Sequence, residues 1–191
     1  YFVSPSGNQN ETVKQLSTLA RNWVSRIQQS TLKDFEILLA YESVLLRQWA
    51  YRLPGSRLTF DECDSIMKIV RPALLHAMHT QKNMSKTLLQ AGDVYVGMGF
   101  RHLYDLAAEE KIKFLHMHLK RNDTTGKLMR ISMQITQLQT GLEDVFYNLS
   151  FERYSHLVTP TWFTSIWEYM DSRLLQLDLA IDVGFQKQRI N

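Results

Sequence analysis

Apolar residues recur three and four positions apart through most of the chain, the spacing that gathers them on one face of an α-helix. A first helix is predicted from residue 11 to residue 29, and a second from residue 31 until Pro54 and Gly55 interrupt it. Further amphipathic segments lie at residues 60–71, 85–90, 103–115, 125–139 and 160–174. The pattern predicts a mainly α fold, a multi-helix bundle.

Several helix starts carry recognisable capping signals. Thr59 followed by Glu62 forms a capping box, in which each side chain accepts a hydrogen bond from the other residue's backbone amide. Thr31 followed by Asp34 resembles the same motif, with the less favourable Asp at its closing position. The pair Thr159-Pro160 predicts another helix start, because the hydroxyl can cap it and proline suits its first turn.

Proline and glycine predict two helix ends. Pro72 has no backbone N–H and should end or kink the helix that follows Thr59. Gly141 is a suitable C-cap for the helix before it. That helix has an apolar face made of Leu128, Ile131, Ile135 and Leu138. Residues 142–158 follow no clear period and are predicted to be irregular.

The two ends of the chain predict minor β structure. Residues 1–3 form an apolar run before a turn, and apolar and polar residues alternate over 175–183, the period of a strand. We assign residues 1–90 to one helical region and residues 91–191 to a C-terminal helical extension. The two are expected to form one continuous structural unit.

Composition places the chain among proteins with a sizeable core. Of its 191 residues, 45% are hydrophobic and 21% are charged. Cys63 is the only cysteine, which excludes an intramolecular disulfide. No apolar run reaches the roughly 18 residues that a membrane span needs, and no signal peptide is recognisable. We therefore expect an intracellular protein that does not contact membranes.

Positive charge gathers in residues 111–130, which we call the basic elbow. This segment holds six basic residues against Asp123 alone, a formal +5, whereas the whole chain is +3. The six are Lys111, Lys113, Lys120, Arg121, Lys127 and Arg130. Clustered positive charge is typical of a surface that contacts nucleic-acid phosphates. The alternative is an exposed turn whose lysines only keep the protein in solution.

Negative charge gathers in the next segment, residues 142–182, which we call the acidic half. It holds seven acidic residues against Arg153 and Arg173, a formal −5. It is also rich in aromatic residues, among them Trp162 and Trp167. This half could neutralise the basic elbow within the fold, or it could bind a protein partner through its aromatic and acidic side chains.

No residue pattern predicts a metal site, a cofactor or a catalytic group. His76 and His79 are three residues apart and His116 and His118 are two apart, but neither pair has the third and fourth ligands of a zinc site. Cys63 lies on the apolar face of its predicted helix and is interpreted as a core residue. The sequence therefore predicts binding rather than chemistry.

Gly126-Lys127 invites comparison with a phosphate-binding loop. That motif needs a second glycine five residues earlier and a Ser or Thr after the lysine, and this chain has neither. A weaker form of the idea remains. Backbone N–H groups at a helix start near Thr125 would favour a phosphate, because they carry the positive end of the helix dipole.

An ordered series of short motifs resembles a known family. The series comprises Phe2-Val3-Ser4-Pro5-Ser6-Gly7, Trp49-Ala50-Tyr51-Arg52-Leu53-Pro54, Leu58-Thr59-Phe60-Asp61-Glu62-Cys63, Val96-Gly97-Met98-Gly99 with Leu103-Tyr104, Gly126-Lys127-Leu128-Met129-Arg130-Ile131, Gln137-Leu138-Gln139-Thr140-Gly141 and Thr159-Pro160-Thr161-Trp162-Phe163-Thr164-Ser165-Ile166-Trp167. It resembles the thumb and C-terminal extension of retroelement reverse transcriptases, the non-LTR-like polyproteins of algae and other protists. Val96 departs from this pattern, which has a glycine there, as do Phe2 and Val3, where Leu-Gly is usual.

The resemblance implies a domain that grips RNA or an RNA–DNA duplex through its phosphates. The polymerase motif Tyr/Phe-x-Asp-Asp is absent from the chain, so the paired carboxylates of two-metal phosphoryl transfer are missing and no catalysis is expected from it alone. The alternative function is a helical scaffold subunit that docks into a larger protein or ribonucleoprotein assembly.

Overall fold

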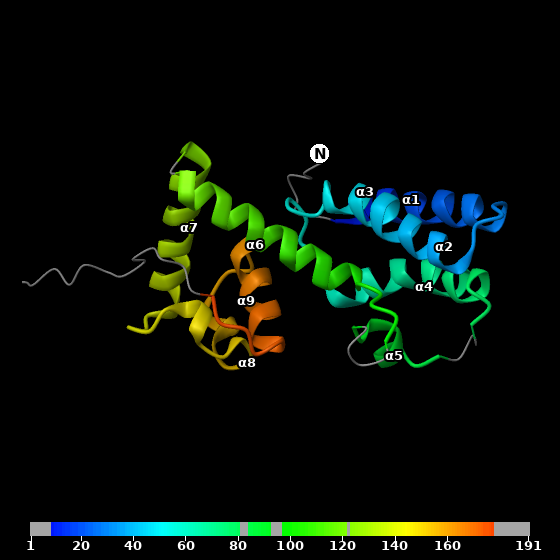
Figure 1. The fold of residues 1–191 in the computed structure, drawn as a ribbon. Coiled ribbons are helices and arrows are strands. Elements are labelled where there is room, and N and C mark those ends of the chain that lie inside the picture. The colour runs from blue at the N-terminus through cyan, green and yellow to red at the C-terminus, as the bar shows by residue number, and fades with distance from the viewer. Residues whose placement is uncertain (1–8, 81–83, 93–96, 122, 178–191) are drawn as a thin grey trace, which may run out of the picture. The chain divides into compact units, whose positions relative to one another are not determined.

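The computed structural model describes residues 9–80, 84–92, 97–121 and 123–177, and most of them are helical (Figure 1). The prediction of a mainly α fold is confirmed. No strand occurs among the described residues. The strand expected at residues 1–3 lies outside them, and residues 175–177 belong to no regular element.

The chain divides into two compact units, Tyr1–Glu110 and Lys111–Asn191. The division falls within one helix, α6 (Leu103–Arg121), whereas the sequence placed the boundary between residues 90 and 91. The segment from residue 97 to residue 110 therefore belongs with the first unit.

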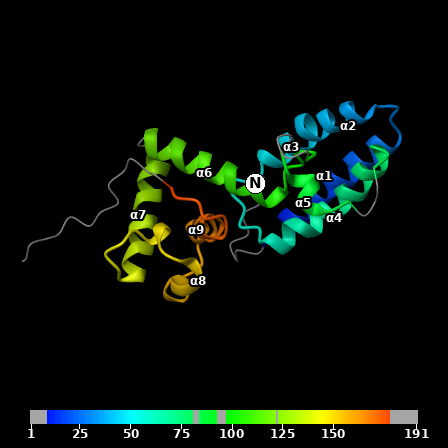
Figure 2. The same ribbon diagram turned by 60° about the horizontal axis from the view of Figure 1, so that its bottom comes forward.

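The first unit is built on two long helices. They are α1 (Asn10–Gln28) and α4 (Phe60–Ala77), which lie side by side in both views (Figures 1 and 2). Between them in sequence run α2 (Asp34–Ala40), the π-helical turn η1 (Tyr41–Leu45) and α3 (Leu46–Ala50). The short helix α5 (Lys86–Gln90) follows α4. Their shared core includes Leu16, Trp49, Leu53 and Ile66, and also the predicted core residue Cys63.

The start of α4 confirms the predicted capping box. Glu62 N donates to Thr59 Oγ1 over 3.3 Å, and Thr59 N donates to Glu62 Oε2 over 2.8 Å. The capping box expected at Thr31 is wrong, because α2 begins only at Asp34 and the Glu36 carboxylate accepts from Lys33 N instead.

Pro72 does not end α4. The helix continues to Ala77, and Val70, Leu74 and Leu75 are all buried beside the proline. Burial of this face stabilises the last turns enough to offset the one backbone hydrogen bond that proline cannot make.

The glycine-containing segment before α6 packs on α5 through its backbone. Met98, Gly99 and Phe100 donate their amides to the carbonyls of Leu88, Ala91 and Leu89 over 3.1, 2.8 and 2.8 Å. A Cβ atom at Gly97 would lie 1.9 Å from the Ala91 carbonyl oxygen, so only glycine fits there. The Gly97-Met98-Gly99 segment therefore has a structural role, which is to pack the chain before α6 against the end of α5.

The second unit contains the end of α6 and two further principal helices, α7 (Thr124–Thr140) and α9 (Trp162–Ser172). The short turns η3 (Phe146–Asn148), α8 (Phe151–Tyr154) and η4 (Ser155–Leu157) connect them, as expected for an irregular segment. The core centres on Trp167, whose ring lies 5.6 Å from that of Phe146 and whose Nε1 donates to Leu149 O over 2.7 Å.

Two helix ends in the second unit test the sequence signals. Gly141 is the left-handed C-cap of α7, with φ of 67°, as predicted. The start expected at Thr159-Pro160 is two residues too early. Thr161 is the N-cap of α9, accepting from Thr164 N over 3.4 Å, while Thr164 Oγ1 accepts from Thr161 N over 2.8 Å.

Candidate nucleic-acid interface

The basic elbow forms where α6 ends at Arg121 and α7 begins at Thr124. Asp123 caps α7 through Oδ1, which accepts from Gly126 N over 2.8 Å, and its Oδ2 lies 2.7 Å from His118 Nδ1 on α6. The hydrogen bond from Gly126 and then that from His118 lower the pKa of Asp123. One carboxylate thus fastens the end of one helix to the start of the next.

Gly126 lets the two helices approach closely at this turn. A Cβ atom there would lie 2.2 Å from the backbone oxygen of His118. The glycine of the Gly126-Lys127 pair therefore has a steric role in the contact between helices, independent of any nucleotide.

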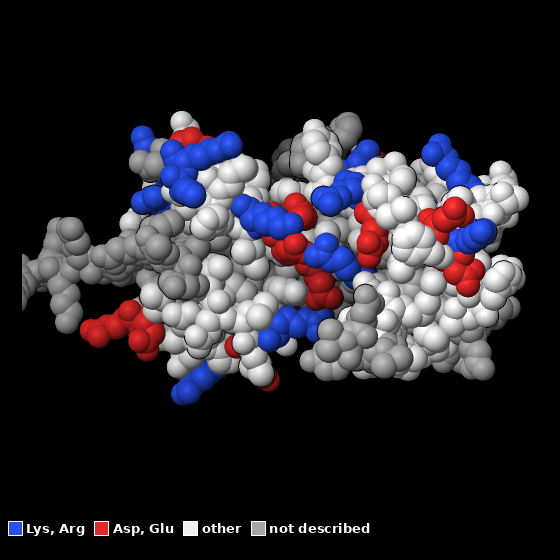
Figure 3. All heavy atoms as spheres, in the orientation of Figure 1, with Lys and Arg blue, Asp and Glu red and all other residues white. Residues whose placement is uncertain are grey.

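Four of the six predicted basic side chains are exposed at or near this turn: Lys113, Lys120, Arg121 and Lys127. Lys120 and Arg121 occupy the last turn of α6, and Lys127 lies in the first turn of α7. Figure 3 shows basic side chains gathered over the end of the second unit where α6 meets α7. The turn therefore presents three cations, Lys120, Arg121 and Lys127, from two fixed helix ends.

Lys111 does not belong to this surface. Its residue is only 3% exposed, and its Nζ donates to Ser165 Oγ on α9 over 3.0 Å. Ser165 Oγ in turn donates to the Trp162 carbonyl over 2.7 Å. Lys111 thus fastens α6 to α9 inside the second unit.

Arg130 is half-buried and serves the end of α6. One guanidinium nitrogen donates to the Leu119 carbonyl over 3.1 Å. A positive group that satisfies a late carbonyl also complements the negative end of the helix dipole. Arg130 adds charge to the elbow, but its guanidinium is partly committed to a structural contact.

The structure does not favour the predicted phosphate site at the start of α7. The Asp123 carboxylate already lies there and accepts a hydrogen bond from the Gly126 amide. A phosphate brought there would meet a negative charge instead of a vacant set of donors. Any contact with phosphates would therefore depend on the exposed side chains.

The described carboxylates of the acidic half, those up to residue 177, do not neutralise the exposed cations directly. Within the part of the chain that the structure describes, Lys120, Arg121 and Lys127 form no ion pair with a carboxylate. The described aromatic residues of this half either lie in the core or pack against it: Trp167 is fully buried and Phe163 is 7% exposed, whereas Trp162 is half-buried. Its carboxylates at Glu143 and Asp144 are exposed.

A second charged cluster lies in the first unit around Asp64, which is 8% exposed. Its carboxylate accepts from Arg71 over 3.3 Å and from Lys86 over 3.2 Å, and Lys68 lies 3.5 Å away. Burial alone would raise the pKa of Asp64, but the hydrogen bonds from Lys86 and Arg71 outweigh it and lower the pKa to about 2. The cluster ties α5 to α4.

His102 completes the Asp64 cluster as a neutral ring. Its Nδ1 accepts from Tyr104 N over 3.2 Å, and its Nε2 lies 3.7 Å from Asp64 Oδ1. Burial lowers the pKa of His102, against the opposing effect of Asp105 and Asp64. The ring stacks on Phe60 at 5.2 Å between centroids.

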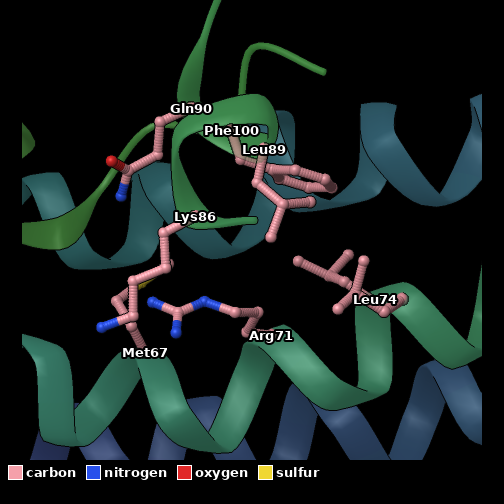
Figure 4. Close-up of a pocket in the computed structure, with 8 residues that line it drawn as sticks. Met67, Arg71, Leu74, Lys86, Leu89, Gln90 and Phe100 are labelled. Carbon is pink, nitrogen blue, oxygen red and sulfur yellow. The ribbon is translucent and has the colours of Figure 1, made fainter. Parts of the chain in front are cut away.

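A small pocket borders this cluster. Figure 4 shows Arg71, from α4, and Lys86, from α5, extending toward one another, with Leu74 and Leu89 on the other side of the pocket. Its enclosed space, about 10 Å³, suits roughly one water molecule. That space is too small for an organic cofactor.

Several histidines fall outside any cluster that could hold a metal. His76 and His79 are exposed at the end of α4, and His118 is engaged with Asp123. Among the described residues, no group of three or more His, Cys, Asp or Glu side chains is arranged to bind a metal ion.

Sequence reasoning missed two buried polar residues. Gln137 is 3% exposed and holds the loop after α7 by three bonds: Nε2 donates to the carbonyls of Leu142 and Asp144, and Oε1 accepts from Phe146 N. The second is Asp64, which follows the core residue Cys63 on α4 and is also buried. In both cases the sequence feature that could have predicted burial was a polar residue at a core position of the helical apolar pattern.

Comparison with known protein families, with curated proteins and with solved structures gives no match to this chain. The resemblance to reverse-transcriptase thumbs therefore rests on the short sequence motifs alone. Within the described ranges, no helix combines the length and the apolar character needed to cross a membrane.

Proposed function

We propose that this chain is a non-catalytic helical domain that binds the phosphate backbone of RNA or of an RNA–DNA duplex through its basic elbow. One observation carries the proposal: Lys120, Arg121 and Lys127 are exposed on two helix ends that Asp123 and Gly126 hold together. Because the two helix ends are held together, the backbone needs little reorganisation to present these cations to a regular array of phosphates.

The likeness of the sequence to reverse-transcriptase thumbs supports the same proposal. A thumb-like role needs contacts to phosphates and none to bases, because the enzyme must hold every sequence that it copies. The exposed groups of the elbow suit that task, since lysine and arginine contact phosphates without reading sequence. The binding is therefore expected to depend on charge and duplex geometry rather than on base order.

Fluorescence anisotropy with labelled duplexes tests the proposal. At about 50 mM salt, where backbone binding is strong, RNA and RNA–DNA duplexes of unrelated sequence should bind with similar affinity. The variant in which Lys120, Arg121 and Lys127 are all replaced by Ala should bind at least about tenfold more weakly, since it loses three phosphate contacts.

A matched control separates the elbow from the general charge of the protein. Lys14, Arg21 and Arg26 are exposed cations on α1, so their joint replacement by Ala removes the same charge from another place. The control should bind as the wild type does. Equal losses for both variants, or no duplex binding by the wild type, would refute the elbow as the binding surface and favour the scaffold function.

A further inference from the structure

The outward face of α7 is more apolar than its buried face. Four aliphatic residues, which we call the aliphatic stripe, are half or more exposed: Leu128 at 60%, Ile131 at 51%, Ile135 at 50% and Leu138 at 62%. The buried face instead comprises Gly126, Met129, Met133, Thr136, Gln137 and Thr140. At about 100° per residue the two sets lie on opposite sides of the helix.

The spacing of the stripe suits a partner helix. Its members are three, four and three residues apart, the a and d positions of two heptads, over about 15 Å of helix. The residues that border it are Lys127, Ser132, Gln134 and Gln139, of which only the first is charged. Isolated exposed aliphatic residues are common, but a continuous stripe with a polar border is typical of an interaction site.

The order of residues in the stripe is the same in both directions. Read from either end it is Leu, Ile, Ile, Leu with the same spacing. An antiparallel copy would place Leu128 against Leu138 and Ile131 against Ile135, and would do so twice by symmetry. We propose that the stripe is a self-association surface, on which α7 of a second copy of this chain packs antiparallel.

Charge at the two ends of α7 favours the same arrangement. The exposed cations Arg121 and Lys127 lie at its start, and the exposed carboxylates Glu143 and Asp144 lie just beyond its end. Figure 3 shows this separation, with basic side chains at one end of α7 and acidic side chains at the other. An antiparallel copy brings opposite charges to the same level, whereas a parallel copy would bring like charges together.

The area of the stripe predicts a weak and reversible dimer. At about 30 Å² of accessible surface per methylene group, four half-exposed aliphatic side chains expose roughly 300 Å² of apolar surface on each copy. Even when the polar border is added, the total surface buried by the dimer stays below the roughly 1,200 Å² of a standard stable complex. We therefore expect a dissociation constant of roughly tens to hundreds of micromolar.

Sedimentation velocity of the full chain tests the proposal, over concentrations from about 5 µM to about 500 µM. The wild type should shift from monomer to dimer across this range. Replacing Ile131 and Ile135 together with Gln should weaken dimerisation at least about tenfold, while circular dichroism shows the fold unchanged, because both side chains are already half exposed.

The first unit provides a matched control. Phe35 and Leu39 on α2 are 73% and 51% exposed, so their replacement by Gln removes a similar apolar surface elsewhere. This control should dimerise like the wild type. A wild type that stays monomeric throughout, or a control variant that loses dimerisation while the stripe variant keeps it, would overturn the proposal.

Cross-linking tests the antiparallel order. Cys63 is buried, so single cysteines placed by Leu128→Cys and Leu138→Cys report on the stripe. An antiparallel dimer predicts a disulfide when the two variants are mixed and little when either is oxidised alone. Efficient linkage of Leu128→Cys with itself would rule out this arrangement. None of these measurements involves nucleic acid, so they test the stripe separately from the elbow.

Discussion

Replacing Asp64 with Asn removes the negative centre of the charged cluster in the first unit. Asn has nearly the same shape, so packing is kept while the charge is lost. Arg71, whose side chain is 19% exposed, is then left without its carboxylate partner, whereas Lys86 at 56% can turn toward water. The main cost should therefore come from the arginine and from the buried amide itself.

The size of the effect follows from the pKa of Asp64, which falls from the ordinary 3.8 to about 2. At about 1.4 kcal/mol for each pKa unit, the ionised carboxylate stabilises the folded state by about 2 kcal/mol. Because the folded pKa is the lower one, this stability is present above pH 3.8 and is lost as the pH falls through 2. The Asn variant should thus be about 2 kcal/mol less stable at neutral pH, and the difference should shrink to a few tenths of a kcal/mol by about pH 2.

Urea denaturation followed by circular dichroism measures this difference at several pH values. Hydrogen exchange of the α4 amides shows whether the loss is local to the first unit. Protonation of His102 in acid destabilises both proteins, so the difference between them is the quantity to follow. Asp61→Asn on the same helix is the control: Asp61 is exposed, and its loss should cost less than about 1 kcal/mol. An Asp64 variant as stable as this control, or a difference that stays near 2 kcal/mol down to pH 2, would refute the reasoning.

Three further predictions, made with four substitutions, test the second unit by urea denaturation. Lys111→Ala should cost about 1–3 kcal/mol, because it breaks a buried contact, whereas Lys120→Ala should stay within about 0.5 kcal/mol; equal effects would contradict the assigned burial. Gln137→Leu should cost at least about 2 kcal/mol, since three backbone groups lose their partner, and hydrogen exchange should rise in residues 142–146; unchanged exchange there would contradict its role. Gly126→Ala should cost about 1–3 kcal/mol through collision with the backbone of α6, and an unchanged stability would show that the helices can separate freely.

The helices could be predicted from sequence because their apolar period is long and regular. The first was expected over residues 11–29 and is found at Asn10–Gln28. Helix ends were less certain. Thr59 and Gly141 act as predicted, but Thr31 does not, since Lys33 and Glu36 supply an alternative start. A capping motif is a local preference, and packing decides which of several motifs is used.

The exposure of the candidate site could not be predicted in the same way. Lys111 and Lys113 are two residues apart on α6, yet only Lys113 is exposed. Which of them is buried depends on where α9 packs, and nothing local in the sequence encodes that contact. The stripe on α7 shows the same limit: periodicity identified an apolar face but could not say that Met129 and Met133 on the opposite side form the core contact.

The salt dependence of duplex binding tests the central proposal most directly. With three to four exposed cations on phosphates, a plot of log affinity against log salt should have a slope of about −3 to −4 on a duplex. Replacing Lys120, Arg121 and Lys127 with Ala should reduce the magnitude of this slope by about 2 to 3 and leave the melting temperature nearly unchanged. A slope that is the same in both proteins, or a melting temperature that falls while the wild type shows little duplex binding, would contradict the account.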